Sequence, residues 1–135
     1  MSRKVIVGLG LVLLAGGVGG GLWWRSSTAW RSAVSAAQPA MPEAVALRVE
    51  ALVGLLWSGE GSAATAGELA MVYHANGYLA EAEQVYRVLA ERDAAEPRWP
   101  YLLSELLGTA GRLAEAESWL RRVVTLAPTH AMARR

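Results

Sequence analysis

Residues able to support acid–base or metal chemistry are few and scattered in this sequence. Its two histidines, His74 and His130, lie far apart, and neither has a carboxylate or a second histidine three or four positions away. That spacing is needed to place two metal ligands on one helix face. Because the chain also contains no cysteine, thiolate metal sites, disulfides and covalently attached haem are excluded.

The motifs of covalent catalysis and phosphate binding are also absent from the sequence. No serine sits in a nucleophile-elbow motif. The glycine-rich stretch over residues 16–21 lies within an apolar run, so it does not form a phosphate loop. We therefore predict that the protein is not an enzyme and holds no cofactor and no metal.

Charge is distributed unevenly along the chain, which limits the class of partner. Residues 1–42 carry four basic residues and no acidic one, whereas residues 43–135 carry nine arginines against twelve acidic residues. An acidic domain lacks the clustered cations that bind nucleic acid, so we expect no nucleic-acid partner. Lys4 is the only lysine and phenylalanine is absent, a composition typical of a GC-rich bacterial coding sequence.

Residues 5–24 form an uncharged, mostly apolar run that predicts a transmembrane helix. Twenty helical residues, at about 1.5 Å each, span the roughly 30 Å hydrocarbon core of a bilayer. Trp23, Trp24 and Arg25 close the run and are the predicted interfacial anchors, because amphipathic rings and a snorkelling cation suit the lipid–water interface. The sequence therefore predicts an anchor over residues 1–24 that contacts the lipid bilayer.

The charges beside the apolar run favour one orientation in the membrane. Arg3, Lys4 and the N-terminal amine precede the run, and Arg25 and Arg31 follow it. The positive-inside rule favours the N-terminus inside and the helical domain in the periplasm, so we expect a single-pass protein of the bacterial inner membrane. Small residues spaced by four predict close packing against another membrane helix. These residues are Gly16, Gly17, Gly20 and Gly21.

Residues 25–42 are rich in serine and alanine and are predicted to form a juxtamembrane linker, with Trp30 at the lipid–water interface. An alternative is that the apolar run belongs to a cleaved signal peptide. Residues 34–36, Val-Ser-Ala, provide an acceptable cleavage site, although they lie well beyond the end of the run. Cleavage there would release a soluble periplasmic domain.

An internal repeat is the most informative feature of the chain. The segment GYLAEAE begins at Gly77 and the segment GRLAEAE begins at Gly111, so six of seven residues are identical at an offset of 34 residues. Helix-like apolar periodicity precedes and follows both segments. The pattern predicts two helical hairpins, over residues 62–96 and 97–130, in which each glycine ends the first helix. A short tail follows over residues 131–135.

The period of 34 residues, with a glycine between two helices, resembles the tetratricopeptide repeat. The first hairpin matches the family pattern at Leu69, Tyr73, Gly77, Ala82 and Tyr86, and the second matches it at Leu103, Gly111, Ala116, Leu120 and Pro128. Ala66 and Pro100 replace the tryptophan of the family's first helix, although Trp99 is one residue away. Ala94 stands where the first closing proline belongs, so we expect an irregular joint between the hairpins.

The resemblance implies a function in protein binding. In the family, the first helix of each hairpin lines a concave groove that holds an extended peptide or a partner's helix. The groove residues implied by position are Met71, His74, Ala75, Arg98, Tyr101, Glu105 and Thr109. Family members that grip a C-terminal carboxylate use lysine, asparagine and arginine where this chain has Gly67, Met71 and Leu102. That specificity is therefore not expected.

Residues 43–61 precede the repeats and contain a further predicted helix, from Glu43 to Trp57. This helix has fifteen residues and contains Arg48 and Glu50, so it is too short and too charged for a second membrane span. We expect it to pack against the first hairpin. The predicted fold is thus all-α, with one transmembrane helix followed by a short solenoid of about five helices.

The last hairpin is predicted to expose apolar side chains. Repeat arrays bury their hydrophobic faces against neighbouring repeats, and the terminal repeat needs a polar cap. The outer face of the last hairpin, including some of Leu113, Leu120 and Val124, is expected to lack such a cover within the chain. We expect another copy, the membrane surface or a subunit of a larger assembly to supply it.

Together these features predict a membrane-anchored scaffold for protein–protein interaction. The preferred hypothesis is an accessory or assembly subunit of a bacterial membrane complex, such as respiratory, photosynthetic, cytochrome-maturation or envelope machinery. Its expected partners are protein subunits of that complex or a second copy in a self-capping homodimer. The alternative is a soluble periplasmic binding module released by signal-peptide cleavage.

Overall fold

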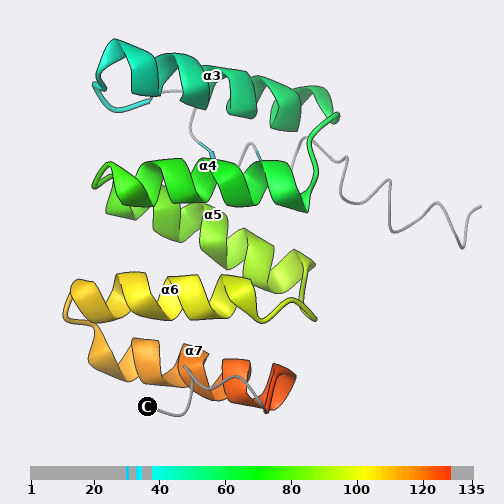
Figure 1. Ribbon diagram of the computed structural model, residues 1–135, viewed down its shortest axis with the longest axis vertical. Coiled ribbons are helices and arrows are strands. Elements are labelled where there is room, and N and C mark those ends of the chain that lie inside the picture. Colours follow the sequence, from blue (N-terminus) through cyan, green and yellow to red (C-terminus); the bar gives the residue numbers. More distant parts are fainter. Residues whose placement is uncertain (1–29, 31–32, 35–37, 129–135) are drawn as a thin grey trace, which may run out of the picture.

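The structure, a computed structural model, describes residues 30, 33–34 and 38–128. Among these residues the regular structure is helical and no strand occurs. The helices are α3 (Glu43–Ser58), α4 (Ala63–Ala75), α5 (Leu79–Arg92), α6 (Arg98–Thr109) and α7 (Leu113–Leu126). They stack in chain order, with α3 at one end and α7 at the other (Figure 1). The predicted all-α solenoid of about five helices is confirmed for this part of the chain.

The predicted membrane anchor over residues 1–24 lies outside the described residues. The same holds for the predicted packing and interfacial residues, which are Gly16, Gly17, Gly20, Gly21, Trp23, Trp24 and Arg25. Among the helices that the structure describes, none is both long enough and apolar enough to cross a bilayer. The membrane anchor therefore remains a prediction.

The turn inside each hairpin is made by a glycine with positive φ. Gly77 has φ of 81° and Gly111 has φ of 78°, a left-handed conformation that glycine adopts without strain. After α4, the Tyr78 N–H donates to the Tyr73 carbonyl oxygen at 2.9 Å, and the equivalent bond follows α6. These bonds satisfy carbonyls at the helix end, so both helices end at the glycines that the repeat predicted.

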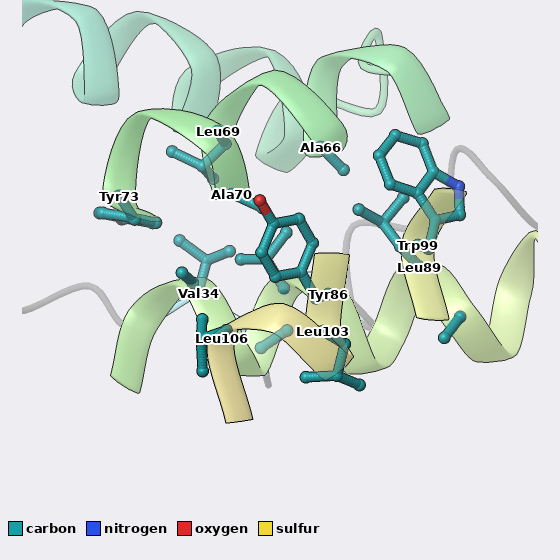
Figure 2. Close-up of a cluster of buried hydrophobic side chains, with 14 of the residues drawn as sticks. Val34, Ala66, Leu69, Ala70, Tyr73, Tyr86, Leu89, Trp99, Leu103 and Leu106 are labelled. Carbon is teal, nitrogen blue, oxygen red and sulfur yellow. The ribbon is translucent and has the colours of Figure 1, made fainter. Parts of the chain in front are cut away.

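One apolar core runs between the stacked helices (Figure 2). Its buried members include Leu69, Tyr73, Tyr86, Leu89 and Leu103. Ala82 of α5 and Ala116 of α7, the small residues of the repeat pattern, are also buried. A small side chain at this position lets the second helix of each hairpin approach its neighbours closely.

The joint between the two hairpins is built around Trp99, at the start of α6. Its ring lies against Gly67 of α4, so closely that a Cβ on Gly67 would come within 2.2 Å of the ring. The Trp99 indole N–H donates to Asp93 Oδ2 at 2.8 Å. This contact fixes the connection between α5 and α6, where Ala94 replaces the proline of the family pattern.

Residues ahead of α3 contribute to the core of the helical domain. Trp30 and Val34 are almost completely buried. The guanidinium carbon of Arg92 lies 5.5 Å from the centroid of the Trp30 ring, and the Tyr73 hydroxyl donates to Gln38 Oε1 at 2.5 Å. The prediction that Trp30 lies at the lipid–water interface is therefore wrong, because its indole buries its apolar surface within the protein instead.

Candidate functional site

The first helices of the two hairpins, α4 and α6, border an open groove. Its lining residues are Met71, His74, Ala75, Tyr86, Leu102 and Glu105. The hollow has a volume of about 440 Å³, which is enough to seat one or two side chains of a bound segment. Because both hairpins contribute lining residues, the groove exists only when the two hairpins are stacked.

A histidine and a tyrosine supply polar groups to the groove. His74 Nδ1 lies 3.4 Å from the Tyr86 hydroxyl oxygen, and the two rings meet edge to face with centroids 5.9 Å apart. Burial, and then the negative charge of Glu105, raises the pKa of Tyr86 to about 12, against the opposing effect of Arg98. The Tyr86 hydroxyl therefore keeps its proton at neutral pH and remains a hydrogen-bond donor.

Glu105 gives the α6 side of the groove a negative charge. The Tyr101 hydroxyl donates to Glu105 Oε1 at 2.8 Å, and this bond raises the pKa of Tyr101. The Thr109 hydroxyl donates to the backbone carbonyl of Glu105 at 3.0 Å. Tyr101 thus orients the exposed carboxylate. Across residues 38–128, no three histidine, aspartate or glutamate side chains are grouped to hold a metal ion.

Apolar side chains occupy both walls of the groove. Met71 of α4 is one of the large hydrophobic residues that the domain leaves exposed, and Leu102 of α6 is half-buried. Ala75, one turn along α4 from Met71, is small and exposed. An unbranched methionine adapts its shape to an incoming side chain, as at other adaptable binding surfaces. The groove therefore combines an apolar strip with one acidic edge.

Four of the seven predicted groove residues, Met71, His74, Ala75 and Glu105, line the same hollow. Tyr101 and Thr109 bond to Glu105 from the same helix, as described above. Arg98 does not line the groove, because its guanidinium carbon lies over the Trp99 ring at 4.2 Å from the centroid. That these residues bind a partner remains a prediction.

Tyr86 and Leu102 line the groove but were not among the predicted groove residues. Tyr86 matches the family pattern of the repeat but stands on the second helix of its hairpin, and its ring is buried. The sequence feature that could have placed Tyr86 at the groove was its hydroxyl, since a buried tyrosine usually directs its O–H to a hydrogen-bond partner. For Leu102 the available signal was its position in the repeat, because carboxylate-gripping members of the family carry a binding residue there.

Residues 101–130, which include most of α6 and all of α7, match the family model of the tetratricopeptide repeat. This segment is therefore similar to one tetratricopeptide repeat. The first hairpin shares the 34-residue register and the glycine turn of this repeat. A comparison with curated proteins found no significant match. Tetratricopeptide repeats are protein–protein interaction modules, and the groove lies on the helices that the family uses for binding.

Proposed function

We propose that the protein is a non-enzymatic scaffold that holds a segment of a protein partner in the groove between α4 and α6. One observation carries this proposal. Side chains from the first helix of each tetratricopeptide-like hairpin converge on a single hollow, and Tyr86 reaches it from the second helix of the first hairpin. Neither hairpin alone presents this combination of apolar and polar groups.

The lining residues favour a particular kind of bound segment. An apolar side chain fits between Met71 and Leu102, where it would remove hydrophobic surface from water. A lysine or arginine of the partner fits beside Glu105, whose carboxylate is exposed and already oriented by Tyr101. A peptide or helix with an apolar residue and a neighbouring cation is therefore the proposed ligand.

The proposed setting is a bacterial membrane complex. The apolar run over residues 5–24, bounded by Trp23, Trp24 and Arg25, supports a single-pass anchor in the inner membrane, with the repeats in the periplasm. In this setting the protein acts as an accessory or assembly subunit of respiratory, photosynthetic, cytochrome-maturation or envelope machinery. The alternative, a soluble periplasmic module, requires cleavage near Ala36.

Affinity purification of the full-length chain in mild detergent tests the role of the groove. We expect a stoichiometric protein partner with the wild-type chain and at least about a tenfold loss of that partner with Glu105→Arg, since a like charge then faces the partner's cation. Glu91→Arg makes the same charge change at an exposed position of α5 outside the groove and should retain the partner. Equal recovery with both variants would count against the groove.

Membrane anchoring is tested separately by fractionating cells and sequencing the N-terminus of the mature protein. An integral anchor predicts a chain that stays in the membrane pellet after an alkaline wash and begins at or next to Met1. A mature chain that begins after Ala36 and is recovered in the soluble periplasmic fraction would favour the alternative. Either result leaves the groove experiment unaffected.

A further inference from the structure

The second helices of the two hairpins, α5 and α7, carry equivalent stripes of residues at the 34-residue offset. On α5 the stripe consists of Leu79, Glu83, Tyr86, Arg87 and Ala90. On α7 the equivalent residues are Leu113, Glu117, Leu120, Arg121 and Val124, called here the α7 stripe. Residues at this spacing lie along one side of a helix. The two stripes are therefore comparable surfaces of the two repeats.

The α5 stripe is covered by the second hairpin, whereas the described residues leave the α7 stripe largely open, with Leu120 and Val124 half-buried. The side chain of Glu83 is 18% exposed and that of Arg87 is 35% exposed, but their equivalents Glu117 and Arg121 are 64% and 77% exposed. Leu113 is 69% exposed, the highest value among the exposed large hydrophobic residues. The α7 stripe thus has the composition of an inter-repeat contact, and no further hairpin lies on it among the described residues.

The covered interface shows which charges such a contact uses. Arg87 donates to Glu83 at 2.7 Å and to Glu115 at 3.0 Å, while Arg112 donates to Glu83 at 2.7 Å and to Glu115 at 2.8 Å. Charges alternate around this ring of four side chains, and bonds from Arg112 and then Arg87 lower the pKa of Glu115. Each hairpin contributes one glutamate and one arginine, so each contributes half of the ring.

The α7 stripe displays one half of such a ring. Arg121 donates to Glu117 at 2.6 Å, with the same spacing of four residues as the pair Glu83 and Arg87. In a second copy of α7 that runs antiparallel to the first, Arg121 takes the place along the helix that Glu117 has in the first copy, and Glu117 takes the place of Arg121. An identical helix running antiparallel would therefore bring an arginine against Glu117 and a glutamate against Arg121.

We propose that the α7 stripe is the interface of a homodimer in which two copies pair their α7 helices antiparallel about a two-fold axis near Leu120. Glu117 and Arg121 of both copies then form an alternating ring like the one between the hairpins. Leu113 of each copy lies towards the C-terminal half of its partner's α7, near Val124, and becomes covered. The contact is isologous, so it closes as a dimer.

The opposite end of the solenoid is less suited to this pairing. Leu47 is exposed on α3, so the outer side of this helix also presents apolar surface. However, Arg48 of α3 already forms an ion pair with Glu68 of α4. Arg48 is the only arginine of α3 and it reaches towards α4, so a head-to-tail contact of α3 with α7 would have no arginine of α3 facing α7 to complete the ring. The α7 stripe does not include the groove-lining residues of α4 and α6, so the dimer is independent of the proposed function.

Cysteine cross-linking in the full-length protein, purified in mild detergent, tests the dimer. The chain has no native cysteine, so a single substitution reports one contact. Leu120→Cys lies near the two-fold axis and should give at least about fivefold more disulfide-linked dimer than Leu113→Cys, because a disulfide needs Cα atoms within about 7 Å. Leu113 lies seven residues away, so its two copies would be about 20 Å apart along the helices.

Leu113→Cys controls for cross-linking by random collision, because Leu113 is well exposed. Leu47→Cys tests pairing through α3. Equal cross-linking at Leu113 and Leu120, or linkage at Leu47 alone, would overturn the proposal. So would the absence of linkage at Leu120 in a chain whose circular dichroism is that of the wild type. If Leu120→Cys disturbs the fold, the mass of the cysteine-free chain in solution takes its place: a dimer that Glu117→Arg dissociates would support the proposal, and a monomer, or a dimer that Glu117→Arg leaves intact, would overturn it.

A charge exchange in the Leu120→Cys background separates specific pairing from collision. Glu117→Arg should lower the cross-linked fraction about fivefold, because it places arginines against each other across the two-fold axis. Adding Arg121→Glu should restore the cross-link, since the ring alternates again. Glu50→Arg on α3 makes the same change on an exposed surface away from α7 and should have no effect. Failure of the double exchange to restore linkage would refute the antiparallel ring.

Discussion

Two helices of this protein, α5 and α7, begin with the same five residues, LAEAE, and end up in different surroundings. Each follows a glycine turn and packs on the first helix of its own hairpin, which is the local result of the shared sequence. Beyond this they differ, because α5 has a second hairpin stacked on its outer side. Leu79 is half-buried there, whereas its equivalent Leu113 is mostly exposed.

The comparison separates the structure that a single hairpin forms from the burial that a stacked neighbouring hairpin adds. At the position of Gly67 in α4, the second hairpin has Tyr101. Glycine is required in the first hairpin because Trp99 of the next hairpin lies on it, and the second hairpin has a half-buried tyrosine at the equivalent position. This difference in sequence between the repeats therefore accompanies a difference in packing.

The largest difference should appear when equivalent apolar residues are truncated. Tyr86→Ala removes a fully buried ring and should lower the free energy of unfolding by about 3–5 kcal/mol. Leu120→Ala, at the equivalent half-buried position, should lower it by about 1–2 kcal/mol. Denaturant unfolding of both variants at a protein concentration where the chain is monomeric measures the two values. Equal losses would show that the two helices are covered to the same extent.

Alkaline pH should lower stability mainly through two buried tyrosines of the first hairpin. Burial raises the pKa of Tyr73 and Tyr86 from 10.0 to about 12, while the equivalent positions in the second hairpin hold leucines. A raised pKa means that the folded state binds the proton more tightly. The contribution of each tyrosine hydroxyl to the free energy of unfolding is therefore complete below pH 10.0 and is lost as pH rises towards about 12. Each tyrosine accounts for about 2–3 kcal/mol.

Chemical denaturation at a series of pH values between neutrality and the alkaline limit measures this loss. The matched control is the double variant Tyr73→Phe/Tyr86→Phe, which keeps the rings but has no ionisable hydroxyl at either position. It should be somewhat less stable at neutral pH, because the bonds to Gln38 and His74 are gone. Its stability should then fall much less than that of the wild type as pH rises. An equally steep fall in the variant would assign the alkaline sensitivity to other groups.

Substituting glycines by alanine should give effects of opposite sign at covered and open positions. Gly67→Ala should destabilise the protein by about 1–3 kcal/mol, because the new Cβ would collide with the Trp99 ring. Gly108→Ala, where a Cβ meets nothing within 4 Å, should stabilise α6 by up to about 1 kcal/mol. Thermal and denaturant unfolding of the two variants gives the sign directly. Stabilisation by both would mean that Trp99 does not lie on α4.

The smallest difference concerns the charged residues. Glu83→Gln removes the acid that accepts bonds from both Arg87 and Arg112, and it should cost about 1 kcal/mol. Glu117→Gln breaks one exposed pair and should cost about 0.3–0.5 kcal/mol in the monomer. Raising the salt concentration should narrow the gap between the two variants. A loss from Glu117→Gln that equals the loss from Glu83→Gln in monomeric protein would contradict the comparison.

Local features of the fold could be predicted from the sequence. Gly77 and Gly111 marked both hairpin turns because a left-handed residue after a helix is a local requirement. Contacts between distant segments could not be predicted in the same way. Periodicity indicates which side of a helix is apolar, but not that Trp99 would lie on Gly67 or that Trp30 would join the core.

The candidate groove shows the same division. Met71, His74, Ala75 and Glu105 followed from their positions on the first helices, because those positions are fixed by the helical repeat. Leu102 also stands at a binding position of the first helix in the family. The contribution of Tyr86, on the second helix of its hairpin, depends on the distance between helices, which only the structure gives.

Photo-cross-linking at one site on each surface tests most directly the central claim that this repeat domain has a groove for a partner and a separate stripe for its own copy. A photoactivatable phenylalanine analogue would replace Met71 or Leu113 in the full-length chain in its native cells. The account predicts an adduct with a different protein from position 71 and an adduct of twice the chain's mass from position 113. The same adducts from both positions, or a second copy of the chain captured from the groove, would contradict it.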